Sequence, residues 1–133
     1  MNAIHIRPLH AEEWSSFKEF RLAALKLAPG MFAASYDEAL ARSPETWQHL
    51  IAGPRHQVFG LFDGTLLIGI TGAFGGREPS DEETAYLVMS FIAPGYRMHG
   101  LSSMLYQARL DWVRMRGSFK RAVTGAGVPE FWL

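Results

Sequence analysis

The stretch SFIAPGYRMHGLSS, residues 90–103, joins two segments of different character. The segment before it, Glu83 to Ile92, is apolar on both faces, which predicts a strand near the centre of a sheet. The segment after it, Leu101 to Arg116, repeats apolar residues at helical spacing, and Gly117 stands where a C-terminal helix cap is expected. The stretch is therefore predicted to be a junction where a buried strand gives way to a long amphipathic helix.

A helix start of this kind is suited to an anion. Its first backbone amides have no partner within the helix, and the helix dipole places partial positive charge there. Gly100 leaves room for close approach, Ser102 and Ser103 add hydroxyl groups, and Arg97 adds a charge. These features favour a ligand that carries phosphate; the alternative is a well-capped turn that binds nothing.

The rest of the chain predicts a mixed α/β sheet in the order β-α-α-β-β-β-α-β. Ala3 to Arg7 alternates like a strand, and apolar spacing from Ala11 to Leu27 predicts a helix. The further expected elements are a helix beginning at Ser43-Pro44-Glu45, a hairpin of His56–Phe62 and Thr65–Phe74 about an Asp63-Gly64 turn, and a last strand at Phe119–Thr124. On the long helix, the residues expected to be buried are Leu101, Met104, Leu105, Ala108, Trp112 and Met115.

Composition narrows the possible functions. The 133 residues are expected to form one domain, 1–133. Thirteen basic and 13 acidic residues give zero net charge, which argues against a nucleic-acid partner. There is no cysteine, which excludes disulfides and thiolate chemistry, and the five scattered histidines do not indicate a metal site. No apolar run is long enough to span a membrane, and a cytoplasmic location is expected.

The segment YRMHGLS, residues 96–102, resembles the acyl-CoA signature of the GNAT superfamily of N-acetyltransferases. That signature runs Arg or Gln, two residues, Gly, one residue, then Gly or Ala. Arg97 and Gly100 match it, and Ser102 departs from it with another small residue. The order of the expected elements and the opening IRPL, residues 6–9, are also similar to the family.

The resemblance implies that acetyl-CoA lies in a gap between the strands at 83–92 and 119–124. Backbone groups of Phe91 and Ile92 would pair with the pantetheine arm as an added strand does. The primary amine of a small molecule or peptide would attack the thioester directly, with a base, an acid and no metal. The residues that the resemblance assigns to the cofactor are Phe91, Ile92, Arg97, Met98, His99, Gly100, Leu101, Ser102 and Ser103.

Two departures from the family bear on catalysis. Many members carry a glutamate midway along the strand before the signature, where this chain carries Tyr86; the nearest carboxylates are Glu82 and Glu83. Glu83 and Tyr86 are therefore the candidate catalytic residues, and a solvated loop carboxylate is the alternative for Glu83. The family also usually continues with a helix and two strands after the last strand expected here, and the chain is expected to lack them.

This shortened end leaves other functions open. The alternatives are a non-catalytic acyl-CoA-binding or regulatory module and a truncated, inactive form of a longer acetyltransferase. A last strand left as an exposed edge would need cover, so a homodimer is expected. Arg21, on the apolar face of the first expected helix, is interpreted either as reaching solvent at the edge or as lining the acceptor site.

Overall fold

The computed structural model describes residues 3–27 and 36–124 of the chain. Its centre is a sheet of strand order β1-β3-β4-β5-β6, with the two-residue β2 also paired to β3. The strands are β1 (Ile4–Pro8), β2 (Ala52–Gly53), β3 (His56–Asp63), β4 (Leu66–Gly75), β5 (Thr84–Ile92) and β6 (Arg121–Val123). Neighbouring strands are antiparallel except β5 and β6, which are parallel. The mixed α/β fold expected from the sequence is confirmed.

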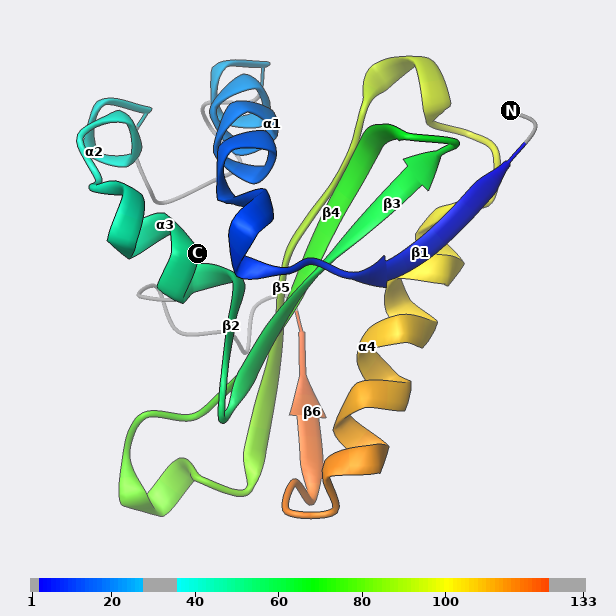
Figure 1. The fold of residues 1–133 in the computed structure, drawn as a ribbon. Coiled ribbons are helices and arrows are strands. Elements are labelled where there is room, and N and C mark those ends of the chain that lie inside the picture. The colour runs from blue at the N-terminus through cyan, green and yellow to red at the C-terminus, as the bar shows by residue number, and fades with distance from the viewer. Residues whose placement is uncertain (1–2, 28–35, 125–133) are drawn as a thin grey trace.

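Helices cover both faces of the sheet (Figure 1). They are α1 (Trp14–Leu27), α2 (Tyr36–Leu40), α3 (Pro44–Ile51) and α4 (Ser102–Arg116). The first three lie on one side of the sheet, and α4 lies on the other. Because parallel neighbours need a crossover, α4 is the connection that allows β5 and β6 to pair in parallel.

The larger core lies between the sheet and α1 to α3. Phe17 from α1 and Trp47 from α3 are fully buried and meet edge-on, with ring centroids 5.5 Å apart. On the other face, the first turns of α4 pack against β3 and β4. Side chains alternate between the two faces of a strand, so β4 and β5 contribute to the packing on both sides.

Local sequence signals located two helix ends correctly. The Ser43 side chain accepts a hydrogen bond from the Thr46 amide at an N···O distance of 3.2 Å, and Pro44 occupies the first turn of α3. Gly117 ends α4 with a φ of 69°, the left-handed conformation of a C-terminal cap.

Several expectations were wrong. The hairpin turn is Gly64-Thr65, because Asp63 still pairs with Leu66 and Gly64 takes the positive φ of 61°. The last strand contains only Arg121–Val123. Arg21 does not reach solvent: it is 5% exposed, and burial lowers its pKa to about 10.

The buried face of α4 also differs from the expected one. Leu105, Arg109 and Val113 are buried, whereas Met115 is 87% exposed. These buried residues are four apart and so form one stripe along the helix. The apolar pattern misplaced the face because the middle position of this stripe is an arginine.

The expected lack of the family's final helix and two strands concerns residues 125–133, which lie outside the described residues. The homodimer that was to cover this edge stays a prediction.

Candidate functional site

Within residues 3–27 and 36–124, one edge of β5 is unpaired along most of its length. β6 pairs only with the first three residues of β5, Thr84–Tyr86 opposite Arg121–Val123. No described strand pairs with β5 beyond Tyr86 on that side. The residues Leu87 to Ile92 therefore border a gap that an extended ligand could enter as an added strand does.

A β-bulge lies in this open half. Between Val88 and Phe91, β5 has two residues where β4 has one, so Met89 and Ser90 together oppose Thr71. Met89 has a φ of 67°, a left-handed conformation that residues other than glycine rarely adopt. The Ser90 and Thr71 hydroxyl oxygens are 2.8 Å apart, which ties the bulge to β4. Sequence reasoning did not find this bulge.

A pocket of about 630 Å³ lies against the open edge. Its walls come from the end of β5, the loop after it and the first turns of α4. Two of the described residues that line it are arginines and none of these residues is acidic, so the charge of this lining suits an anion. The lining residues are Ser90, Phe91, Ile92, Tyr96, Arg97, Met98, Gly100, Leu101, Ser102, Leu105, Tyr106 and Arg109.

The loop enters α4 through left-handed backbone. Gly100 has a φ of 74°, and Met98 has a φ of 68°. A Cβ added at Gly100 would meet no atom within 4 Å, so the backbone angle, rather than lack of space, favours glycine there. Gly100, Leu101 and Ser102 all line the pocket, which places the positive end of the α4 dipole at its wall.

Arg97 fastens the loop to the end of β5. Its Nε donates to the Ile92 carbonyl at 2.9 Å, and its guanidinium lies 4.8 Å from the centre of the Phe91 ring. The Ile92 carbonyl is thus engaged where the family resemblance expects pantetheine. A carbonyl oxygen can accept two hydrogen bonds, so a ligand that pairs here would either share this carbonyl with Arg97 or displace it.

Comparison with known proteins agrees with this geometry. A sequence model of the acetyltransferase (GNAT) family matches residues 8–128, most of the chain. The chain belongs to the GNAT acetyltransferase family. Among curated proteins no sequence match is found.

Solved acetyltransferase structures share the fold. One is a predicted acetyltransferase with acetyl-CoA from Clostridium acetobutylicum (12% identity, 93% of this chain and 81% of that one, TM-score 0.73). Another is an aminoglycoside acetyltransferase in complex with sisomicin, from an uncultured soil metagenomic sample (17% identity, 94% and 78%, TM-score 0.71). A third is a ribosomal-protein-alanine N-acetyltransferase from Brucella melitensis (21% identity, 98% and 85%, TM-score 0.66).

Most residues assigned to the cofactor of this GNAT protein meet at the pocket. Those that line it are Phe91, Ile92, Arg97, Met98, Gly100, Leu101 and Ser102. His99 is exposed and does not line it, and neither does Ser103, whose hydroxyl donates to the Gly100 carbonyl at 2.9 Å. Sequence reasoning missed Ser90, Tyr96, Leu105, Tyr106 and Arg109. The four-residue spacing from Leu101 through Leu105 would have indicated Arg109.

The two candidate catalytic residues lie toward the other end of β5. Glu83 precedes the strand, about 30 Å from Ile92 if the chain is extended, and its carboxylate lies 3.4 Å from the Lys120 Nζ. Tyr86 is 6% exposed and donates to the Asp81 carboxylate, which raises the pKa of the tyrosine. Tyr86 is therefore protonated at neutral pH, and both catalytic roles stay predictions.

The described residues show neither a cluster of metal ligands nor a helix that could span a membrane. Among residues 3–27 and 36–124, no three His, Asp or Glu side chains gather as a metal would require. In that part of the chain, every helix is too short or too polar to cross a bilayer.

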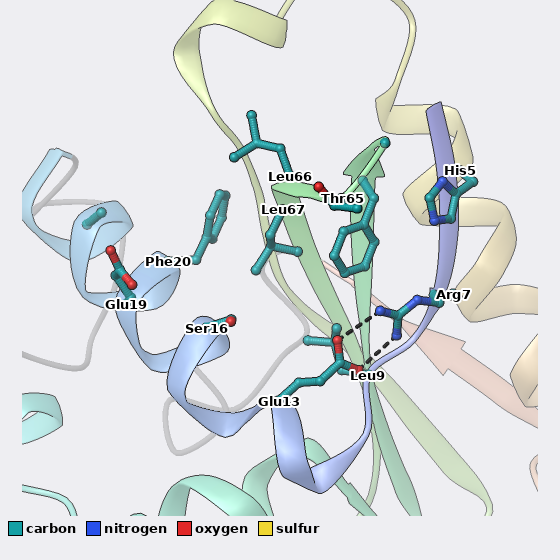
Figure 2. Close-up of a pocket in the computed structure, with 13 residues that line it drawn as sticks. His5, Arg7, Leu9, Glu13, Ser16, Glu19, Phe20, Thr65, Leu66 and Leu67 are labelled. Carbon is teal, nitrogen blue, oxygen red and sulfur yellow. Dashed lines mark hydrogen bonds and ion pairs between the residues drawn. The ribbon is translucent and has the colours of Figure 1, made fainter. Parts of the chain in front are cut away.

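A second pocket, of about 650 Å³, lies between α1, β1 and the tip of the β3–β4 hairpin (Figure 2). On its wall, the Arg7 guanidinium donates two hydrogen bonds of 2.8 Å to Glu13, and the exposed Glu19 adds a carboxylate. Phe20 lines this pocket and meets Phe91 of the first pocket edge-on, with ring centroids 6.1 Å apart. The two linings therefore touch at this aromatic pair.

Proposed function

We propose that this protein transfers an acetyl group from acetyl-CoA to a primary amine of a small molecule or peptide. The observation that carries this proposal is the pocket at the open edge of β5, where a helix N-terminus, two arginines and an unpaired strand edge meet without an acidic residue. Phosphates suit the helix N-terminus, and an extended amide-bearing arm suits the strand edge.

The cofactor would enter from the loop. Its pyrophosphate would meet the backbone from Gly100 to Ser102, and its pantetheine arm would pair with the edge at Ile92, beside Arg97 or in its place. The arm would then bring the thioester toward the bulge at Met89. The structure of a predicted acetyltransferase with 12% sequence identity contains acetyl-CoA, which supports this choice of donor.

The proposed reaction is a direct acyl transfer. The neutral amine nitrogen bonds to the thioester carbonyl carbon, the carbon–sulfur bond breaks, the amine loses a proton to a base, and the thiolate takes one. Tyr86, held protonated by Asp81, is the proposed proton donor. Glu83, about 20 Å from Met89 along an extended strand, is the proposed base and would take the proton through a chain of several waters. Tyr86→Phe and Glu83→Gln are each expected to lower kcat by roughly 100-fold while leaving the Kd for acetyl-CoA unchanged.

The second pocket is the proposed acceptor side. A primary amine is protonated at neutral pH, and the carboxylate of Glu19 would attract it. Phe20 links this pocket to the cofactor pocket through Phe91. Glu19→Gln is expected to raise the KM for the amine about threefold to tenfold without altering acetyl-CoA binding. Glu12→Gln, on the same exposed surface but outside the pocket, is the matched control.

Calorimetry tests the donor. The wild-type protein is expected to bind one acetyl-CoA. Gly100→Glu, which sets a carboxylate against the phosphates, is expected to abolish binding, whereas Gly95→Glu in the same loop is not. A wild-type protein that gives no heat with acetyl-CoA, or a Gly100→Glu variant that binds normally, would overturn the proposal.

A thiol-release assay tests turnover. The amines to assay include sisomicin and a peptide with N-terminal alanine, because structural neighbours carry these names or ligands. Release of free thiol that depends on the amine supports the enzyme.

A non-catalytic acyl-CoA-binding module is the second candidate. This candidate is favoured because both proposed catalytic side chains already have partners: Glu83 forms an ion pair with Lys120, and Tyr86 donates a hydrogen bond to Asp81. Binding of acetyl-CoA without turnover of any amine would support it.

A further inference from the structure

We infer that Arg109, two turns into α4, forms a phosphate subsite for the cofactor, beyond the signature loop. The inference rests on the proposed function, because it takes acetyl-CoA as the ligand of the pocket. The pyrophosphate has two phosphates, and the one assigned to Arg109 is the phosphate bonded to the pantetheine arm.

Arg109 is buried at a position where α4 otherwise presents apolar residues. It is 6% exposed and lies between Leu105 and Val113 on the stripe that faces the sheet. Burial lowers the pKa of its guanidinium, because a charged group is poorly solvated there. Among the described residues, no carboxylate forms an ion pair with it. A buried cation without an anion is costly, and an anionic ligand would offset that cost.

The side chain of Arg109 turns back toward the helix N-terminus. Its Nε donates to the Leu105 carbonyl at 3.3 Å, which places the guanidinium near the turn before its own Cα. Leu105 is only one turn from Leu101, so the charge stands about 6 Å along the axis from the start of α4. Its guanidinium also lies 5.8 Å from the centre of the Tyr106 ring. Within the described residues its Nη groups make no hydrogen bond, and Arg109 lines the pocket.

Both arginines of the pocket donate through Nε to a backbone carbonyl and lie over an aromatic ring, but Arg97 is exposed and holds the end of β5, whereas Arg109 is buried. Arg97 donates to the Ile92 carbonyl and covers the Phe91 ring. The pyrophosphate carries two negative charges, and the helix N-terminus supplies only partial positive charge. Arg109 is therefore the lining cation best placed to supply the rest, through bonds that a planar guanidinium makes well with phosphate.

The position of Arg109 indicates which phosphate of coenzyme A it would contact. It lines the pocket together with Ser90 and Phe91, on the side where β5 is open. The pantetheine arm is proposed to run along that side. The phosphate nearest to Arg109 is then the one on the arm, and the 3′-phosphate of the adenosine lies farther away.

Binding of a truncation series tests this assignment. Wild-type protein, Arg109→Met, Arg109→Lys and Arg114→Met are titrated with coenzyme A, dephospho-coenzyme A, 4′-phosphopantetheine and pantetheine. Arg109→Met is expected to weaken the first three ligands by roughly 10- to 100-fold and to leave pantetheine unchanged. Arg109→Lys keeps the charge but loses the planar fork, so a smaller loss is expected. Arg114, on the exposed side of the same helix, is the control.

Three results would overturn the inference. An Arg109→Met penalty confined to coenzyme A would place the contact at the 3′-phosphate. A penalty that persists with pantetheine would show a packing role, and normal binding of all ligands would show no role. Thermal melting monitors folding, since methionine at this buried position is expected to leave the Tm unchanged or raise it. If wild-type protein binds none of the four ligands, the proposed function fails instead.

Discussion

The phenolic hydroxyl of Tyr96 donates to the Asp63 carboxylate at an O···O distance of 2.8 Å. Tyr96 belongs to the loop after β5, and Asp63 ends β3 beside the hairpin turn. The bond raises the pKa of Tyr96, which therefore stays protonated as the donor. It connects the loop between β5 and α4 to a hairpin that is 33 residues away in sequence.

Removal of this bond is expected to loosen the loop. Tyr96→Phe should lower the free energy of unfolding by about 1 kcal/mol and weaken acetyl-CoA binding about threefold to tenfold. A double-mutant cycle with Asp63→Ala should show a coupling energy, because the two side chains contact directly. Tyr36→Phe, on α2, is the control. Additive effects of the two substitutions would contradict this prediction.

Gly100 is expected to be needed for its backbone angle. Gly100→Ala should lower the free energy of unfolding by about 1 kcal/mol, although its Cβ would meet no atom within 4 Å. Gly95→Ala is the matched control: its Cβ would also meet no atom, and its φ is not positive. Chemical denaturation compares the two variants, and equal losses would show that the angle is not the cause.

Glu13 is expected to contribute to stability in a pH-dependent way. The hydrogen bonds from Arg7 lower the pKa of Glu13 from 4.5 to about 2. Because the pKa of Glu13 is lower in the folded state than in the unfolded state, its ionised carboxylate stabilises the folded state at pH values above about 4.5. That stabilisation is lost as the pH falls from about 4.5 through 2. Because the pair is partly exposed, the contribution is about 1 kcal/mol or less.

Glu13→Gln should therefore be less stable than wild type at pH 7, and the difference should vanish near pH 2. Unfolding curves measured across this range check the effect. Glu12→Gln should follow the wild-type curve, since Glu12 is exposed and takes part in no recorded bond within the described residues. A Glu13→Gln difference that is constant with pH would contradict the linkage.

The cap of α3 is expected to depend on one hydroxyl. Ser43→Ala should lower the free energy of unfolding by about 1 kcal/mol, because the Thr46 amide loses its acceptor. Ser43→Asp keeps an acceptor and should match or exceed wild type. If alanine and aspartate behave alike, the cap does not contribute.

The junction between β5 and α4 was readable from sequence because it depends on neighbours along the chain. A strand end, a left-handed glycine and a helix start lie within residues 90–103, and their backbone preferences are local. The cap at Ser43 and the end of α4 at Gly117 were found for the same reason. These are properties of a few consecutive residues and need no knowledge of the rest of the fold.

Other features depended on packing between distant segments. The bulge at Met89 arises from the register between β4 and β5, which no local pattern reports. The buried face of α4 was misplaced because an arginine occupies it, and only a neighbouring sheet shows which side of a helix is covered.

Local chemistry thus specified the elements and the junction between β5 and α4, and it favours an anionic ligand at that junction. The depth of Arg109, the contact of Tyr96 with Asp63 and the open edge of β5 were decided by the tertiary structure. The physical reason is the distance along the chain over which each interaction acts. Backbone angles and caps act over a few residues, whereas burial, ion pairing and strand pairing depend on which remote surfaces the chain brings together.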